Sequence, residues 1–167
     1  MRERIKRTIC MVALGATTLF ACETNYEITL PQTPYYDNDN KRIAVEPDPK
    51  AHPYDISRAK YIEGTPTILY NPRFLKTLPK KIQLFVFYHE IDHFKLNHVP
   101  KKKKKNSFDE MELMQHQADC YSIKYLNLNL NYSPKEIKTG IIDKFFLYDL
   151  QPKRKREAID CLERNKR

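Results

Sequence analysis

The chain has only three glycines in 167 residues, and this scarcity excludes several classes of active site. Phosphate-binding loops, dinucleotide-binding turns and the nucleophile elbow of serine hydrolases each need two or more glycines within a few positions. Gly64 and Gly140 lie far apart in the sequence, and Gly15 falls in the leader segment described below. The sequence therefore lacks what these nucleotide-binding and serine-hydrolase sites require.

The rest of the composition is typical of a folded protein. A length of 167 residues predicts one domain with a moderate core. Apolar residues make up 41% of the chain, and eleven Tyr and eight Phe supply large side chains that can be buried. One functional site is expected to serve the whole protein.

The first 21 residues have the pattern of an export signal. A charged start, "MRERIKR", precedes the apolar segment "TICMVALGATTLF", which is short for crossing a bilayer. The join that follows, "LFAC", resembles the bacterial lipobox, in which the cysteine becomes a lipidated N-terminus. We therefore expect residues 1–21 to be a lipoprotein signal peptide, and Cys22 to anchor the protein to a membrane of the bacterial cell envelope, periplasmic or surface-facing. The alternative is a soluble secreted protein in which Cys22 is an ordinary residue.

Removal of the leader changes both the charge and the cysteine count. The formal charge is +9, and the leader carries four Arg or Lys against one Glu, so the rest retains +6. No nucleic-acid partner is expected for an exported chain, despite this charge. Cys10 leaves with the leader and Cys22 takes the lipid, which leaves Cys120 and Cys161. We expect these two to form a disulfide in an oxidising compartment; two separate buried thiols are the alternative.

Two regions follow the leader. Residues 22–53 contain five prolines and little periodicity, which predicts a flexible tether with at most one short strand, at "KRIAVE". Residues 54–167 carry the regular patterns and are expected to form the domain.

A β-hairpin is predicted at the start of the domain. The β-prone runs 59–62 and 67–70 lie on either side of a turn in which Gly64 can adopt a positive φ. Pro66 indicates an edge position for the second strand, because proline has no N–H to donate to an inner ladder.

The remainder of the sequence is helical in pattern. The first helical segment is strongly apolar and contains neither Gly nor Pro. Two later segments begin with Ser-x-x-Glu capping boxes, at Ser107 and Ser133. The predicted helices span residues 79–97, about 108–126, 134 to about 148, and 152 to about 161.

The first helix contains the pattern "HEIDH", which is typical of a zinc site. His89 and His93 are four positions apart and project from one face of a helix, so that both imidazoles can reach one ion. Glu90 lies beside them, where its carboxylate can take a proton from an attacking water. Two ordinary histidines on a packed helix are the alternative, but burying them with an acid in such an apolar segment is costly without a metal.

Two segments together resemble a known family. "HEIDHFKLNH" and "QHQADCYSIKYL" look like the zinc metallopeptidases of the HtpX-like and prenyl-protease type, the gluzincins, particularly their small secreted bacterial relatives. The resemblance covers roughly residues 60–162. It implies that His89 and His93 bind Zn²⁺, that Glu90 is the catalytic base, and that Asp119 orients a ligand histidine from outside the coordination shell.

The third zinc ligand departs from the family pattern. The family has a glutamate four residues before the aspartate, whereas this sequence has Gln115 four residues before Asp119. His116 and Glu112 lie near the same helical face and are the candidates to replace it. We favour His116, because imidazole is a strong zinc ligand. The alternatives are Glu112 as the third ligand and a degenerate site that has no third ligand.

Together these observations predict a fold and an activity. The expected fold is α+β and zincin-like, with a short antiparallel β-sheet packed on the active-site helix and a C-terminal helical bundle. The expected function is that of a membrane-anchored zinc metallopeptidase that hydrolyses peptides or unfolded proteins. A catalytically degenerate lipoprotein that uses the same fold for binding is the alternative.

Overall fold

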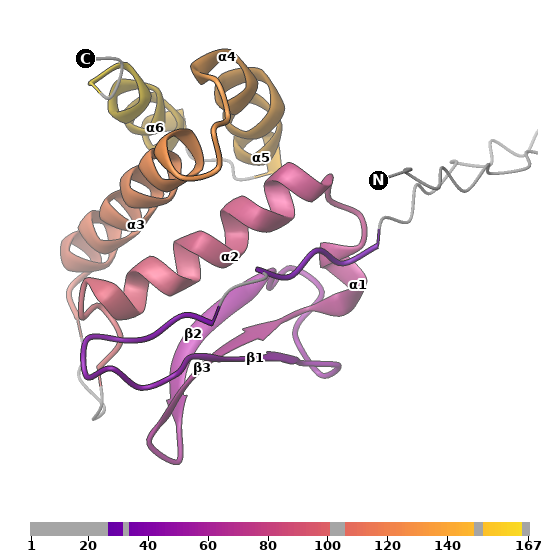
Figure 1. The fold of residues 1–167 in the computed structure, drawn as a ribbon, viewed down its shortest axis with the longest axis vertical. Helices are drawn as coiled ribbons and strands as arrows, with labels where there is room; N and C mark the ends of the chain where they lie inside the picture. The colour runs from indigo at the N-terminus through magenta and orange to yellow at the C-terminus, as the bar shows by residue number, and fades with distance from the viewer. Residues whose placement is uncertain (1–26, 32–33, 101–105, 149–151, 165–167) are drawn as a thin grey trace, which may run out of the picture.

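The computed structural model describes residues 27–31, 34–100, 106–148 and 152–164. Helix α2 (Lys80–Lys95) runs through the middle of the domain, with a small β-sheet on one side and the later helices on the other (Figure 1). The α+β class predicted from the sequence is therefore confirmed. The predicted signal peptide and lipidated Cys22 lie outside the described residues.

The predicted hairpin is present. Strands β2 (Ser57–Ile62) and β3 (Thr65–Tyr70) pair antiparallel, with Ile62 opposite Thr65. The two turn residues both have positive φ, 49° at Glu63 and 79° at Gly64. Two-residue turns of this kind match the twist of the strands they connect, which explains the glycine at the second position.

The sheet is mixed rather than purely antiparallel. Strand β1 (Ala44–Pro47) pairs parallel to β3, so the strand order is β1-β3-β2 and β3 is central. The edge position predicted from Pro66 was therefore wrong. Pairing with β1 begins only at Thr67, so the missing N–H of Pro66 falls beyond the end of β1, where no ladder bond is lost.

The described part of the predicted tether contacts the domain. Its Thr29 N–H donates to the side-chain oxygen of Gln83 at 2.6 Å, and its Ile43 is 5% exposed. Asp37, also buried, accepts a hydrogen bond from the Tyr61 hydroxyl at 2.8 Å. Strand β1 belongs to the same segment, which therefore adds both a strand and core residues to the fold.

Two asparagines mark helix ends on either side of α2. A short helix, α1 (Pro72–Leu75), precedes α2 and was not predicted from the sequence. The side chain of Asn71 caps α1 by accepting hydrogen bonds from two of its N–H groups. Asn97, with a φ of 56°, follows the end of α2, a left-handed position at which asparagine is tolerated.

Both predicted capping boxes are formed. They open α3 (Phe108–Leu128) at Ser107 and α4 (Pro134–Ile137) at Ser133. The single helix predicted from residue 134 to 148 contains a π-helical turn, η1 (Lys138–Ile142), between α4 and α5 (Asp143–Tyr148). The last helix is α6 (Pro152–Arg164).

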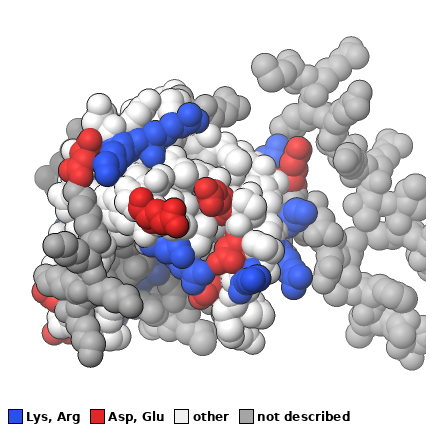
Figure 2. Space-filling view, turned by 90° about the horizontal axis from the view of Figure 1, so that it is seen from below, with Lys and Arg blue, Asp and Glu red and all other residues white. Residues whose placement is uncertain are grey.

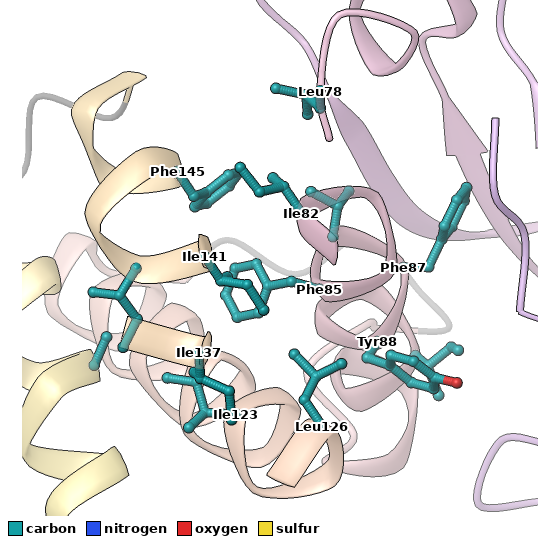
Figure 3. Close-up of a cluster of buried hydrophobic side chains, with 14 of the residues drawn as sticks. Leu78, Ile82, Phe85, Phe87, Tyr88, Ile123, Leu126, Ile137, Ile141 and Phe145 are labelled. Carbon is teal, nitrogen blue, oxygen red and sulfur yellow. The ribbon is translucent and has the colours of Figure 1, made fainter. Parts of the chain in front are cut away.

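The hydrophobic core surrounds α2. Phe85 is fully buried, and its ring meets that of Phe145 edge to face at 5.2 Å, on the side of the later helices (Figure 3). On the sheet side, Phe87 makes a similar contact with Tyr70 at 5.7 Å. Because packing holds α2 from both sides, the polar side chains of "HEIDH" are also held within the domain.

The surface below the sheet carries charges of both signs. Figure 2 shows Lys or Arg side chains and Asp or Glu side chains interspersed there. Among the described residues, none of the helices combines the length and apolar character that crossing a bilayer requires.

Candidate metal centre

The two histidines of "HEIDH" meet at their Nε2 atoms. His89 and His93 lie one turn apart on α2, and their Nε2 atoms are 3.0 Å apart. Both residues are buried, 7% and 8% exposed. The spacing predicted from the sequence thus produces a converging pair of imidazole nitrogens.

On its other side, His89 faces a carboxylate. Its Nδ1 lies 2.8 Å from Oδ1 of Asp119, and the charge of this carboxylate acts on the imidazole more strongly than the hydrogen bond does. Arg154 of α6 holds the same carboxylate with two nitrogens, at 2.6 and 2.8 Å. Burial alone would raise the pKa of Asp119, but His89 and Arg154 outweigh it and hold the pKa below its usual range. Asp119 is therefore ionised and attracts the Nδ1 proton of His89. Its role as the partner that orients a metal ligand stays a prediction.

His93 is oriented by a second chain of contacts. Its Nδ1 lies 3.1 Å from Nδ1 of His98, whose Nε2 lies 2.9 Å from the side-chain oxygen of Gln117. A carbonyl oxygen only accepts, so Nε2 of His98 carries the proton and its Nδ1 accepts from His93. Burial, followed by the charges of His89 and His98, lowers the pKa of His93 to about 2. His93 is therefore neutral, with the lone pair of its Nε2 directed toward His89.

Gln115 completes the cluster from α3. Its side-chain oxygen lies 3.0 Å from Nε2 of His89, and its amide nitrogen lies 3.4 Å from Nε2 of His93. Nε2 of His89 therefore faces two acceptor atoms. Burial by itself lowers the pKa of His89, but the charge and hydrogen bond of Asp119 outweigh it and raise the pKa. The space between the rings favours positive charge, whether a proton or a metal ion.

The donor set fits zinc. Two nitrogens bound to a tetrahedral zinc at about 2.0–2.1 Å are about 3.3 Å apart, close to the 3.0 Å between these rings. Each of the two imidazoles has its other nitrogen engaged by an outer partner, the arrangement usual for metal-binding histidines. His89 and His93 would hold the ion, and the oxygen of Gln115 is the third candidate donor.

The structure does not bring the predicted third ligand, His116, to this cluster. Its Nδ1 lies 3.5 Å from Oε2 of Glu157, and its ring contacts the sulfur of Cys120. The other candidate, Glu112, pairs with Lys153 at 2.8 Å. Adjacent helical residues point about 100° apart, so His116 faces α6 where Gln115 faces α2. The spacing of four between Gln115 and Asp119 was the sequence signal for the residue that reaches the site.

Glu90 is next to His89 in the sequence and lies beside the histidine pair. Its Oε1 accepts a hydrogen bond from the Ser57 hydroxyl at 2.8 Å, and the Ala59 N–H also donates to the carboxylate. Burial raises the pKa of Glu90, outweighing the opposing effects of His89 and of these two donors. A carboxylate whose pKa is raised binds a proton more readily, which suits a general base.

A cleft connects these groups to the surface. It has a volume of about 230 Å³ and an open mouth, and residues from five parts of the fold line it. They are the segment 54–57 at the start of β2, then Phe85, Val86, His89 and Glu90 of α2, Gln115 of α3, and finally Phe145 and Arg154. Ligand-accessible space therefore adjoins both the imidazole of His89 and the carboxylate of Glu90.

Comparison with known families agrees with this geometry. Residues 51–135, half of the chain, match the family DUF2201_N, described as "Putative metallopeptidase domain". The chain belongs to this metallopeptidase-domain family. The match spans β2 through α3 and so includes "HEIDH", Gln115 and Asp119. None of the curated proteins and none of the solved structures gives a match. The finer resemblance to HtpX-like gluzincins stays a prediction.

Removal of His98 is expected to weaken zinc binding by about 10–100-fold, since it is the outer partner that orients His93. Competition with a chromophoric chelator would measure the affinity of His98→Ala. His52→Ala, a change of the same kind at an exposed position away from the cluster, is the control. Equal affinities for the two variants would contradict the orienting role.

Proposed function

We propose that the chain is a zinc-dependent metallopeptidase in which Glu90 is the general base. One observation carries the proposal: two buried imidazole nitrogens converge, and one of these imidazoles lines an open cleft together with a carboxylate of raised pKa. Membership of the metallopeptidase-domain family supports it.

Each residue has a distinct part in this reaction. Zinc, when bound, supplies a Lewis acid that polarises the scissile carbonyl and acidifies water. His89 and His93 would hold the ion through Nε2. Glu90 accepts a proton from the attacking water and then delivers it to the leaving amine. Ser57 and Ala59 keep the carboxylate directed into the cleft during both transfers.

The free edge of β2 is the candidate peptide-binding strand. Backbone N–H groups of a strand alternate in direction, and the Ala59 N–H points to Glu90 rather than to β3. This edge of β2 therefore borders the site. An extended peptide that pairs with it would bring a backbone carbonyl close to Glu90.

The first test of this proposal measures the metal content of the purified protein and its hydrolysis of casein. The proposal expects one zinc per chain, loss of activity after chelation, and recovery when zinc is restored. Tight zinc binding without hydrolysis of casein or of other unfolded proteins would favour a binding role. Absence of zinc binding would leave "HEIDH" as a structural pattern only.

The degenerate binding protein is the second candidate, because the third donor is an amide. Gln115→Glu would supply a carboxylate at the same place and is expected to tighten zinc binding by at least about tenfold, or 1.4 kcal/mol. With the Cys120–Cys161 disulfide intact, His116→Ala, one position away but facing α6, should leave zinc affinity unchanged. Zinc loss in His116→Ala would return the third-ligand role to His116.

We further propose that a lipid on Cys22 anchors the protein in the bacterial cell envelope. The support is the sequence "LFAC" after an export-type leader. Cell fractionation of wild type and Cys22→Ser would test it. The wild type should sediment with membranes and the variant should be soluble; equal membrane association would exclude the anchor.

A further inference from the structure

A second group of metal-binding side chains lies between α3 and α6. His116 and Cys120 are four residues apart on α3, and Glu157 and Cys161 are four residues apart on α6. Donor atoms of His116 and the two cysteines all lie within 4.8 Å of one another. Glu157 adds a carboxylate oxygen 3.5 Å from Nδ1 of His116. Each helix thus presents two donors to the other on successive turns.

Cys120 and Cys161 form a disulfide, with their Cα atoms 5.5 Å apart, as predicted from the sequence. In this state neither sulfur carries the negative charge that makes a cysteine a metal ligand. The group can therefore hold a metal ion only after the disulfide is opened.

We propose that His116, Cys120, Glu157 and Cys161 form a second metal site, for a thiophilic divalent cation such as zinc, which becomes available when the disulfide is reduced. Two thiolates, an imidazole and a carboxylate give four donors, the number that a structural zinc site uses. Thiolate donors favour zinc over the harder cations magnesium and calcium. This site is separate from the one formed by His89 and His93.

The disulfide is opened and closed again by thiol–disulfide exchange. A dithiol reductant passes two electrons and two protons to the disulfide and itself becomes a disulfide. The resulting thiols of Cys120 and Cys161 each lose one proton when the cation binds. Oxidation by a disulfide donor reverses both steps and releases the cation.

The surroundings suit this role. His116 and Glu157 retain 25% and 29% side-chain exposure, so an ion can enter, while Cys161 is 3% exposed. A guanidinium nitrogen of Arg164 donates to the sulfur of Cys161 at 3.3 Å. A charged donor at that distance stabilises a thiolate and is a typical outer partner of a metal-bound sulfur.

The site would keep α3 and α6 joined in both redox states. In the oxidised protein the disulfide connects them, and in the reduced protein the cation does. The connection matters for the first site, because Asp119 is next to Cys120 and its partner Arg154 lies on α6. Metal at the second site would thus preserve the contacts that orient His89.

Cobalt titration of the full-length chain tests the proposal, because a cobalt–thiolate bond gives an intense near-ultraviolet band that imidazole and carboxylate ligands lack. The His89→Ala/His93→Ala variant, with the first site removed, is reduced, freed of reductant under anaerobic conditions, and titrated. We expect one cobalt per chain with the thiolate band, and no band before reduction. A thiol assay confirms that reduction is complete.

Two further variants in this background assign the ligands. Cys120→Ser/Cys161→Ser should lose the band, although Cys10 and Cys22 remain. His116→Ala retains both cysteines, so formation of the disulfide in its oxidised form shows that the variant folds. After reduction it should bind cobalt at least about tenfold more weakly than the reduced parent. The proposal is overturned if the fully reduced parent shows no band, if the band survives in the serine variant, or if His116→Ala binds as tightly as the parent.

Discussion

Replacement of Glu90 by glutamine is expected to lower kcat/KM for peptide hydrolysis by about 10²–10⁴-fold, the usual contribution of a general acid or base. Glutamine has nearly the same size and can still interact with Ser57, but it cannot accept the proton of the attacking water. Zinc content should stay at one per chain, because Glu90 is not among the candidate ligands. Casein hydrolysis and metal analysis on the same sample would show both results.

Glu110→Gln is the matched control for this variant. Glu110 caps α3 at its surface, away from the cleft, so its replacement should leave kcat/KM unchanged. Activity of Glu90→Gln equal to that of the control would mean that Glu90 is not the base. Loss of zinc together with activity would instead make Glu90 part of the metal-binding set.

Replacement of Arg154 by methionine is expected to reduce the free energy of unfolding by about 3–5 kcal/mol, as is usual when one partner of a buried ion pair is removed. The side chains of Arg154 and Asp119 are 15% and 1% exposed, and two hydrogen bonds join them. For a chain of this size, the loss corresponds to a Tm lower by roughly 6–20 °C. Zinc affinity should fall as well, since Asp119 would hold His89 less firmly.

Two comparisons make this prediction specific. Arg156→Met is the same substitution on the exposed side of α6 and should change stability by no more than about 0.5 kcal/mol. Arg154→Met combined with Asp119→Asn should recover much of the lost stability, because the unpaired buried charge is gone. A single Arg154 variant as stable as the Arg156 control would show that the ion pair contributes little.

Helix α3 connects the two proposed sites through adjacent residues. Gln115 and Asp119 face α2, where Ser122 also donates to Asp92 at 3.0 Å. His116 and Cys120, one position later in each case, face α6. A helix packed on two sides can therefore supply both sites from one short stretch of sequence.

Elements whose causes are local could be predicted from the sequence. The hairpin turn follows from Gly64, and the helix starts at Ser107 and Ser133 follow from capping boxes, which involve only a few neighbouring residues. The spacing of His89 and His93 brings their imidazoles together on one face of α2, because the geometry of an α-helix is fixed. Pairing of Cys120 with Cys161 followed from the small number of cysteines left to choose between.

Contacts between residues of different elements could not be predicted from the sequence and became visible in the folded chain. Three contacts depend on how elements distant in sequence are packed. They are the parallel pairing of β1 with β3, the contact of Gln115 rather than His116 with the histidine pair, and the ion pair that Arg154 of α6 forms with Asp119. Adjacent residues on α3 point about 100° apart, so Gln115 faces the histidine pair on α2 whereas His116 faces α6. Local patterns fix the faces of each helix, but the partner of each face is set by the packing of the whole core.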